Sequence, residues 1–309
     1  MDSIDYELAI IGGGPAGLTA GIYAARSRLK ILLLEKVVPG GQILWTDWIE
    51  NYPGFPEGLS GYELARKMAD QIARFEVPVE TEEVLSMECD GPVKRLILKK
   101  KTIAVHAVII ATGASPNRLS IPGEEAYLGK GVSFCATCDG PFYRDKIVAV
   151  TGGGNTAVQE GDFLTKFAKK VYIIHRRREL RATKILQERA LKNPKIEFIW
   201  DSVVTQIDGH DSVEKVHVKN IKTGNESELA VSGFFIFIGT HPNTEFLCKE
   251  IKTDERGFII VDHNMETSVS GVYAAGDVRN TPLRQVVTAA GDAAIAAFSA
   301  EKYVENLKL

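Results

Sequence analysis

Two glycine-rich motifs, 140 residues apart, constrain the fold of this chain more than any other feature of its sequence. The first motif, Gly12 to Gly17, has the pattern G-x-G-x-x-G, and the second, Gly152 to Ala157, has the pattern G-x-G-x-x-A. Each motif follows a short apolar run typical of a buried strand and precedes a segment that favours a helix. A strand, a glycine turn and a helix in this order begin a Rossmann-type unit. Because the order occurs twice with the same spacing, we expect two such units.

The first motif has the residues that a dinucleotide site needs. Gly12 permits a tight turn, Gly14 allows the backbone to approach a pyrophosphate, and Gly17 allows helix and strand to pack closely. The helix begins at this turn, so its N-terminus faces the negative charge of a phosphate. Glu35 ends the second strand, where an acidic residue is expected to bind ribose hydroxyl groups. The alternative is a tight turn beside a solvated glutamate.

The second unit differs at the position that corresponds to Glu35. The run His175–Arg178 stands there, and Arg181 follows it. A guanidinium cluster can bind a 2′-phosphate through charge-assisted bidentate hydrogen bonds, whereas a carboxylate would repel it. We therefore predict that the second site binds NADP(H). The alternative is a solvated basic patch, which is the usual role of a charge run.

Cys135 and Cys138 form a Cys-x-x-Cys pair that Asp139 follows directly. This spacing allows a disulfide within one turn and is typical of thiol exchange, in which a neighbouring acid protonates the leaving sulfur. The pair also has the spacing of half a zinc site, but no second Cys-x-x-Cys or nearby histidine pair completes four ligands. We expect the other two cysteines, Cys89 and Cys248, to be half-buried bystanders.

Length and charge exclude several classes of function. The 309 residues fit about two domains, and the net charge of -3 gives no reason to expect nucleic acid or an anionic membrane as a partner. The first residues are acidic, unlike a signal peptide, and no apolar run approaches about 18 residues. We therefore expect a cytoplasmic protein without a membrane partner.

Two segments with a shared pattern are predicted to connect the domains. An apolar strand ends before Gly113-x-x-Pro116, another ends before Gly239-x-x-Pro242, and each proline precedes an asparagine. Glycine and proline fix a turn where few contacts cross between domains. After the second connection, Gly276-Asp277 can offer a carboxylate or backbone amides to a cofactor. The first domain is therefore expected to be discontinuous.

Together these motifs resemble the low-molecular-weight bacterial thioredoxin reductases along essentially the whole chain. The resemblance rests on the two glycine motifs, the run Cys135-Ala136-Thr137-Cys138-Asp139, the basic run at 175–182, and the segments Gly41-Gln42, Ala111–Gly113, Ala275–Asp277 and Arg284-Gln285. A Cys-Ala-Thr-Cys-Asp run within the second nucleotide domain separates this group from relatives of glutathione reductase, whose disulfide lies near the start of the chain.

The expected fold is α/β, with two Rossmann-like three-layer domains, the second inserted into the first. The resemblance implies that residues 1–114 and 244–309 bind FAD, and that residues 115–243 bind NADPH and carry the redox-active pair. It also implies a homodimer that passes electrons from NADPH through FAD to this pair and on to oxidised thioredoxin. Cys138 would be the thiol nearer the flavin, Cys135 would attack the partner disulfide, and Asp139 would protonate the leaving thiolate.

Most of the remaining candidate site residues are expected to bind a cofactor, and none is expected to bind a metal. The cofactor-binding candidates are Gly12, Gly14, Pro15, Ala16, Gly17, Glu35, Lys36, Gly41, Gln42, Asn51, Ala111, Thr112, Gly113, Gly276, Asp277, Arg284, Gln285, Val286, Gly152, Gly154, Asn155, Thr156, Ala157, His175, Arg176, Arg177, Arg181 and Gly239. Two alternative functions stay open. One is a reductase of a peroxiredoxin or another small dithiol carrier, and the other is a protein without redox activity that binds a nucleotide or zinc.

Overall fold

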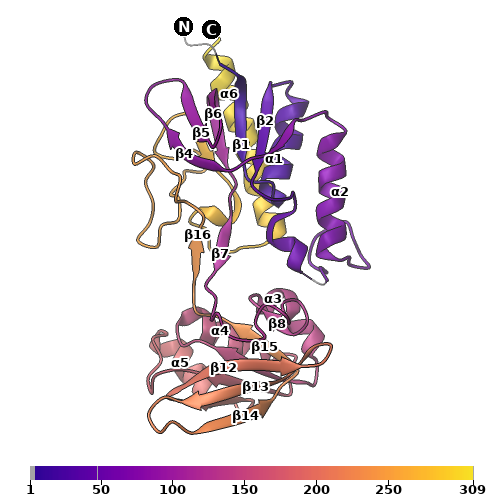
Figure 1. The fold of residues 1–309 in the computed structure, drawn as a ribbon, viewed down its shortest axis with the longest axis vertical. Coiled ribbons are helices and arrows are strands. Elements are labelled where there is room, and N and C mark those ends of the chain that lie inside the picture. The colour runs from indigo at the N-terminus through magenta and orange to yellow at the C-terminus, as the bar shows by residue number, and fades with distance from the viewer. Residues whose placement is uncertain (1–3, 47, 309) are drawn as a thin grey trace. The chain divides into compact units, whose positions relative to one another are not determined.

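The computed structural model describes residues 4–46 and 48–308. The chain divides into two compact units, and Figure 1 labels most of their elements. The first unit runs to Thr46, resumes over Tyr52–Ser115 and includes the chain from His241 onward. The second unit holds Pro116–Thr240 and the short segment that ends at Asn51. The second unit is therefore inserted into the first, as the sequence predicts.

A mostly parallel sheet forms the centre of the first unit. Its strands are β1 (Tyr6–Ile11), β2 (Ile31–Glu35), β3 (Val79–Thr81), β4 (Val84–Glu88), β5 (Lys94–Leu98), β6 (Thr102–Ile110) and β17 (Val272–Ala274). The strand order is β3-β2-β1-β6-β5-β4, and β17 also pairs with β6. Strands β3, β2, β1, β6 and β17 are parallel, whereas β4 and β5 are antiparallel to their neighbours. Residues at the centre of β1, β2 and β6 are fully buried, as expected of parallel strands covered on both faces.

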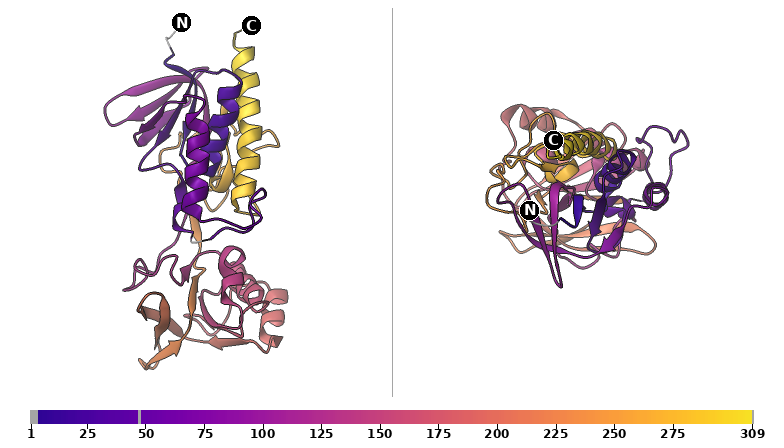
Figure 2. Two further views of the ribbon diagram at one scale, coloured as in Figure 1. Left: turned by 90° about the vertical axis from the view of Figure 1, so that its right-hand side faces the viewer. Right: turned by 90° about the horizontal axis from the view of Figure 1, so that it is seen from above.

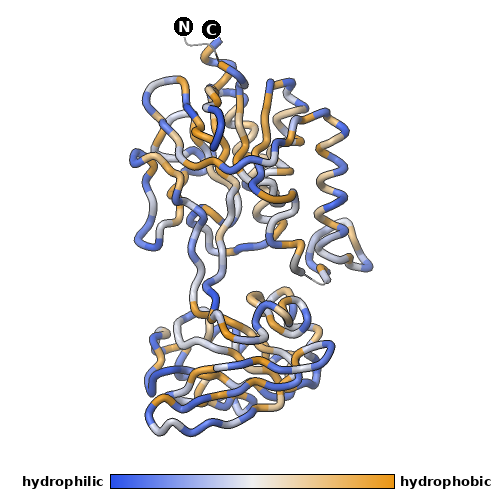
Figure 3. The backbone as a smooth tube through the Cα atoms, in the orientation of Figure 1, coloured by the Kyte–Doolittle hydropathy of each residue, from blue (hydrophilic) through white to orange (hydrophobic). Residues whose placement is uncertain are grey.

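Three long helices of the first unit lie side by side in Figure 2. They are α1 (Pro15–Arg26), α2 (Gly61–Ala73) and α6 (Val286–Asn306), and the unit also has the 3-10 helices η1 (Gly41–Trp45) and η3 (Gly276–Val278). Ser60 begins α2, because its side-chain oxygen accepts a hydrogen bond from the backbone N–H of Glu63 at 3.1 Å. Helix α2 buries Leu64, Met68 and Ile72 on one face, so hydrophobic and hydrophilic residues alternate along it in Figure 3. No helix among the described residues is long and apolar enough to cross a membrane.

The second unit contains a parallel sheet in the order β11-β10-β9-β15-β8 and an antiparallel sheet in the order β12-β13-β14. The strands are β8 (Val132–Ser133), β9 (Ile147–Thr151), β10 (Lys170–Ile174), β11 (Ile196–Ile199), β12 (Ser202–Gly209), β13 (Val213–Asn220), β14 (Glu226–Ala230) and β15 (Gly233–Ile236). The helices are α3 (Ala136–Asp139), η2 (Gly140–Tyr143), α4 (Asn155–Leu164) and α5 (Lys184–Lys192).

The repeat seen in the sequence is also present in the strand register. Ile10 of β1 faces Leu33 of β2. Val150 of β9 and Ile173 of β10, each 140 residues further along the chain, face one another in the same way. The two units therefore begin with the same strand–turn–helix–strand arrangement, which confirms the predicted α/β fold.

Two short strands connect the units, and they pair with each other. They are β7 (Ala114–Pro116) and β16 (Thr240–Pro242). The backbone N–H of Asn243 donates to the carbonyl of Gly113 at 3.0 Å, and that of Asn117 donates to the carbonyl of Gly239 at 2.9 Å. Each asparagine side chain also donates to the carbonyl of the residue before that glycine, at 2.8 and 3.3 Å. Each connection is therefore held by the asparagine of the other.

Helix α1 lies so close to its glycine turn that position 17 has no room for a side chain. A Cβ atom on Gly17 would collide with the backbone carbonyl of Gly12. Gly161 of α4 is less crowded, because a Cβ atom there would first meet the tip of the Ile173 side chain, at 2.9 Å. A side chain at position 17 would thus meet rigid backbone, whereas one at position 161 would meet the flexible end of a side chain.

We predict that Gly17→Ala lowers the free energy of unfolding by about 1–3 kcal/mol, because it overpacks the contact between helix and turn. Gly161→Ala is the matched control. Its smaller clash is offset by the roughly 1 kcal/mol that alanine gains over glycine in a helix. Urea unfolding followed by circular dichroism measures both. A loss for Gly17→Ala no larger than that of the control would contradict the prediction.

Candidate functional site

The first glycine turn leaves the N-terminus of α1 open to a ligand. Gly12 has a φ of +105°, and a Cβ atom there would collide with the carbonyl of Ala111, so only glycine fits. Gly14 caps α1 without a side-chain hydrogen bond, and Pro15 begins the helix. The backbone N–H groups of the first helical turn therefore have no side-chain cap, which suits a phosphate.

Glu35 has a structural contact that its motif does not indicate. One carboxylate oxygen accepts a hydrogen bond from the backbone N–H of Gly13 at 2.7 Å, and the other accepts one from Val37 at 3.0 Å. The carboxylate therefore holds the glycine turn against the end of β2. Binding of a ribose by Glu35 stays a prediction, and Lys36 beside it is exposed.

The segment after β2 lies against the same turn. The backbone N–H of Gly40 donates to the carbonyl of Gly13 at 2.8 Å, and the side-chain amide of Gln42 donates to the carbonyl of Ala114. Gln42 thus joins η1 to the connection that leaves β6. Asn51, predicted for the same site, is grouped by its contacts with the second unit.

Gly276 lies where the starts of α1 and α6 meet. A Cβ atom on Gly276 would come within 3.1 Å of the Ala16 side chain and 3.3 Å of the Ala289 side chain. Burial raises the pKa of the adjacent Asp277 to about 6, with the positive charge of Arg284 opposing and the negative charge of Asp292 adding to the shift. The structure therefore brings together the predicted residues of both halves of the discontinuous unit.

Arg284 is the polar side chain of this region that most clearly fits a ligand. Its Nε and Nη2 atoms are buried and have no hydrogen-bond partner in the part of the chain that the structure describes. The guanidinium lies over the ring of Phe258, 4.2 Å from the centroid, and burial lowers its pKa. A buried cation without an acceptor is costly unless an anion joins it. Val286 begins α6 next to it, and Gln285 and Thr288 form a capping box there.

These observations fit a phosphate-bearing dinucleotide such as FAD in the first unit. The Arg284 Nε and Nη2 atoms, which lack a hydrogen-bond partner among the described residues, and the uncapped start of α1 both suit phosphate oxygens. An added Cβ on Gly14 would meet no atom closer than 3.9 Å. Two residues that sequence reasoning missed support the site. Arg279 holds Asp292 at 2.7 and 2.8 Å, and Asp292 in turn accepts from the backbone N–H of Gly276. The sequence signal for this contact was Asp292 itself, an acidic residue among the alanines of α6.

The second glycine turn is built like the first, with His175 in the place of Glu35. The imidazole ring covers Gly153, where a Cβ atom would collide with it. His175 is buried, and burial lowers its pKa, with further lowering by Arg181, Arg176 and Arg177. Its Nε2 atom has no hydrogen-bond partner among the described residues.

Arg181 lies beside the second glycine turn and is exposed. The backbone N–H of Arg181 donates to the carbonyl of Gly153 at 2.7 Å, and that of Thr183 donates to the Asn155 side chain at 2.8 Å. Gly154, which caps α4 without a side-chain hydrogen bond, has no atom within 4 Å of an added Cβ. Arg176 and Arg177 are also exposed. A phosphate at this helix start would therefore have guanidinium groups nearby.

Cys135 and Cys138 form a disulfide at the one-turn helix α3 of the second unit. Their Cα atoms are 5.3 Å apart, and both side chains are partly exposed. The Cys135 sulfur accepts a hydrogen bond from the backbone N–H of Cys138 at 3.2 Å and contacts the Thr137 hydroxyl at 3.3 Å. Both contacts would stabilise a thiolate on Cys135 after reduction. Asp139 follows as the last residue of α3 and is partly buried.

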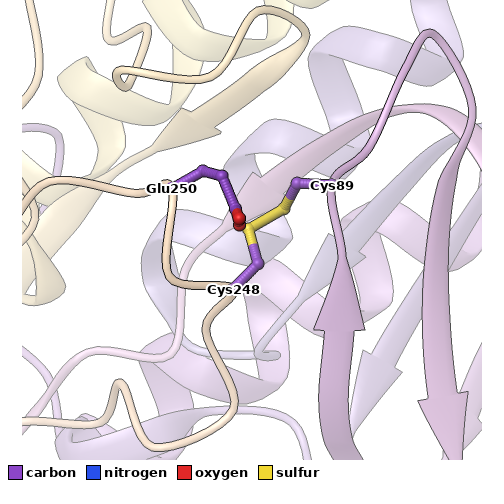
Figure 4. A group of neighbouring side chains, drawn as sticks. All are labelled: Cys89, Cys248 and Glu250. Carbon is purple, nitrogen blue, oxygen red and sulfur yellow. A yellow bond between two sulfur atoms is a disulfide. The ribbon is translucent and has the colours of Figure 1, made fainter.

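The expectation that Cys89 and Cys248 are half-buried bystanders is wrong. They are 7% and 9% exposed, and they form a second disulfide with Cα atoms 6.2 Å apart (Figure 4). Their sequence separation of 159 positions hides this contact from any argument based on spacing. The Glu250 carboxylate points at the pair, and the three ligand atoms lie within 4.8 Å of one another.

Comparisons with known proteins agree with this geometry. Residues 6–293 match the family described as pyridine nucleotide-disulphide oxidoreductase. The chain is 47% identical to the thioredoxin reductase of Peptoclostridium litorale over 308 residues, with 98% of each chain covered. It is 46% identical to the thioredoxin reductase of Peptoclostridium acidaminophilum over 306 residues, with 97% of each covered.

A solved structure gives the same result. The crystal structure of thioredoxin reductase from Streptococcus pyogenes MGAS5005 matches with a TM-score of 0.94 and 48% identity, covering 97% of this chain and 98% of that one. Two glycine turns with one register, a disulfide in the inserted unit and full-length similarity lead to one conclusion. The chain belongs to the pyridine nucleotide-disulphide oxidoreductases and, within them, to the thioredoxin reductases.

Proposed function

We propose that this protein uses NADPH and FAD to reduce the disulfide of a thioredoxin, with Cys135 and Cys138 as the exchanging pair. The observation that carries this proposal is the partly exposed disulfide in a unit that also has an NADP-type glycine turn. The named substrate of the relatives supports thioredoxin over another small dithiol carrier. A cytoplasmic location is part of the proposal, because the reaction consumes NADPH.

The two units would have different nucleotide roles. We assign FAD to the first unit, where Arg284 and the start of α1 suit phosphate oxygens and Glu35 carries the acid of the motif. We assign NADPH to the second unit, because Arg176 and Arg181 stand where an acid would repel the 2′-phosphate. When bound, FAD would accept a hydride from NADPH and supply two electrons for reduction of the protein disulfide.

The chain's own residues would then perform the exchange. Reduction breaks the bond between Cys135 and Cys138. The Cys135 thiolate, stabilised by the N–H of Cys138, attacks one sulfur of the thioredoxin disulfide and displaces the other. Asp139 would give that leaving thiolate its proton. Cys138 next attacks the Cys135 sulfur, so thioredoxin leaves as a dithiol and the enzyme disulfide forms again.

We predict that Cys135→Ser and Cys138→Ser each abolish reduction of thioredoxin by NADPH, because neither variant can form the disulfide. Both should still bleach the yellow flavin colour when NADPH is added without oxygen, since that step needs no thiol. Steady-state turnover with thioredoxin and anaerobic absorbance spectra are the measurements. Cys89→Ser is the control and keeps turnover. A colourless protein inert to NADPH, or full turnover in either first variant, would overturn the proposal.

We also predict that Arg176→Gln with Arg181→Gln raises the KM for NADPH on the order of 10–100-fold. The double variant removes charge-assisted hydrogen bonds to the 2′-phosphate, which at an exposed site contribute about 1.5–3 kcal/mol in total. The KM for NADH, which lacks that phosphate, changes little. Arg66→Gln, an exposed arginine of α2, is the control. Equal changes in both KM values would show that the arginines only make a solvated patch.

We further propose that the protein is a homodimer joined through α1 and α6. Tyr23 of α1 and Ile295 and Phe298 of α6 are 50%, 41% and 54% exposed. Tyr23 and Phe298 line one shallow hollow, with Arg26, Ser27 and Glu301. Large apolar side chains grouped in this way on two packed helices are typical of a surface that another chain covers.

We predict that Ile295→Glu with Phe298→Glu converts a dimer into a monomer, because it would bury two charges in the interface. Sedimentation velocity at micromolar concentration measures the mass of each species. Tyr62→Glu, which changes a side chain of α2 that is 63% exposed, is the matched control and leaves the dimer intact. A monomeric unmodified protein, or a dimeric double variant, would contradict this interface.

A further inference from the structure

The second disulfide joins two parts of the first unit that are distant in sequence. Cys89 directly follows β4, at the start of the β4–β5 turn, and Cys248 lies in the segment without regular structure that follows β16. The backbone N–H of Met87, two residues before Cys89, donates to the carbonyl of Phe246, two residues before Cys248, at 3.0 Å. The disulfide and this hydrogen bond therefore join the same two segments, the β4–β5 hairpin and the chain that returns from the inserted unit.

Its sulfur atoms are in the hydrophobic core. Cys89 and Cys248 belong to a cluster of buried residues that includes Phe246 and Ile251. Thiol exchange requires an attacking thiolate to reach a sulfur along the axis of its disulfide bond. A protein-sized dithiol can meet this condition at the partly exposed pair at Cys135, but not at a pair that is 7% and 9% exposed. The two disulfides therefore differ in access.

The closed ring of this disulfide contains the long continuous segment of the inserted unit. Residues 116–240 all lie between Cys89 and Cys248, as do β7 and β16. The other disulfide, between Cys135 and Cys138, lies wholly within that ring and on one side of the exposed β13–β14 turn at 221–225. A cut in this turn would leave only Cys89 and Cys248 to join the two fragments covalently.

Glu250 suggests a metal site at the same place, but the sulfurs are bonded to each other. A zinc ion needs both as thiolates and a fourth ligand. The described residues that could ligate an ion here are Cys89, Cys248 and Glu250. Because the two sulfurs are bonded to each other, the structure favours a disulfide over a zinc site. A zinc site is one of the outcomes that the test below distinguishes.

We propose that Cys89–Cys248 is a second disulfide that takes no part in turnover. It links the returning segment 246–251 covalently to the β4–β5 hairpin, and it is not reduced by the dithiol that the enzyme produces. Its resistance to that dithiol rests on the proposed function, whereas its existence does not. The disulfide forms by exchange with an oxidised protein or small-molecule disulfide. Two thiols lose two electrons and two protons, and the oxidant becomes two thiols. This step precedes burial of the segment, because the folded core excludes the oxidant.

The test cuts the chain inside the ring. A recognition sequence for a specific protease is inserted between Thr223 and Gly224, and cells are lysed in N-ethylmaleimide so that thiols cannot oxidise later. After cleavage, we expect one full-length band on a denaturing gel without reductant and two fragments with reductant. The same insertion in Cys89→Ser should give two fragments in both lanes. In Cys135→Ser it should behave as in the unmodified chain.

Two fragments without reductant in the otherwise unmodified protein would overturn the proposal. About one zinc per chain, measured on that protein, would assign the site to a metal instead. This gel needs no enzyme activity. The disulfide can therefore prove absent in a protein that reduces thioredoxin, and it can prove present in a protein that does not.

Resistance is tested on the cut protein before denaturation. Reduced thioredoxin is added to the folded protein, thiols are then blocked with N-ethylmaleimide, and the gel is run without reductant. We expect the full-length band to persist, and to be lost when the same dithiol acts in concentrated urea. Loss of the band from the folded protein would show that the pair exchanges, and would overturn the proposed resistance.

Discussion

The rest of the molecule depends on the close approach of backbone to backbone at the two glycine turns. At Gly12 and Gly152, an added Cβ would collide with the carbonyl of the strand end beside it, Ala111 or Phe237. This proximity places the start of a helix next to the carboxyl ends of the parallel strands, where uncapped backbone N–H groups converge. A side chain at either glycine would separate strand from helix and remove the place where a phosphate fits. Packing and binding therefore share one geometric requirement.

Much of this arrangement could be predicted because it is local in the sequence. The offset of 140 residues predicted the repeat, and the register of Ile10 with Leu33 and of Val150 with Ile173 confirms it. The cap of α2, where the Ser60 side chain accepts from the backbone N–H of Glu63, is another contact between near neighbours. Local patterns of this kind report the preferences of a few consecutive residues, so they succeed where the structure is decided over short distances.

The features that could not be predicted depend on contacts between distant residues. Pairing of Cys89 with Cys248 requires the chain to return from the inserted unit to the β4–β5 hairpin, and spacing contains no trace of that return. The hold of Glu35 on Gly13 was missed for another reason. The motif indicates an acid for a ribose, but the same acid also satisfies a backbone N–H of the turn. Roles of single residues in cofactor binding stay predictions.

The reciprocal asparagine contacts explain how a domain can interrupt another without disturbing it. Because β7 and β16 are paired neighbours, the inserted unit leaves and rejoins its host at almost one point. To the host, 125 residues in between are equivalent to an enlarged surface loop. The entropy of closing a loop grows only with the logarithm of its length, so such an insertion is tolerated almost independently of its size. A duplicated unit could thus be accommodated within an existing fold, and its sequence could then change to bind a second nucleotide.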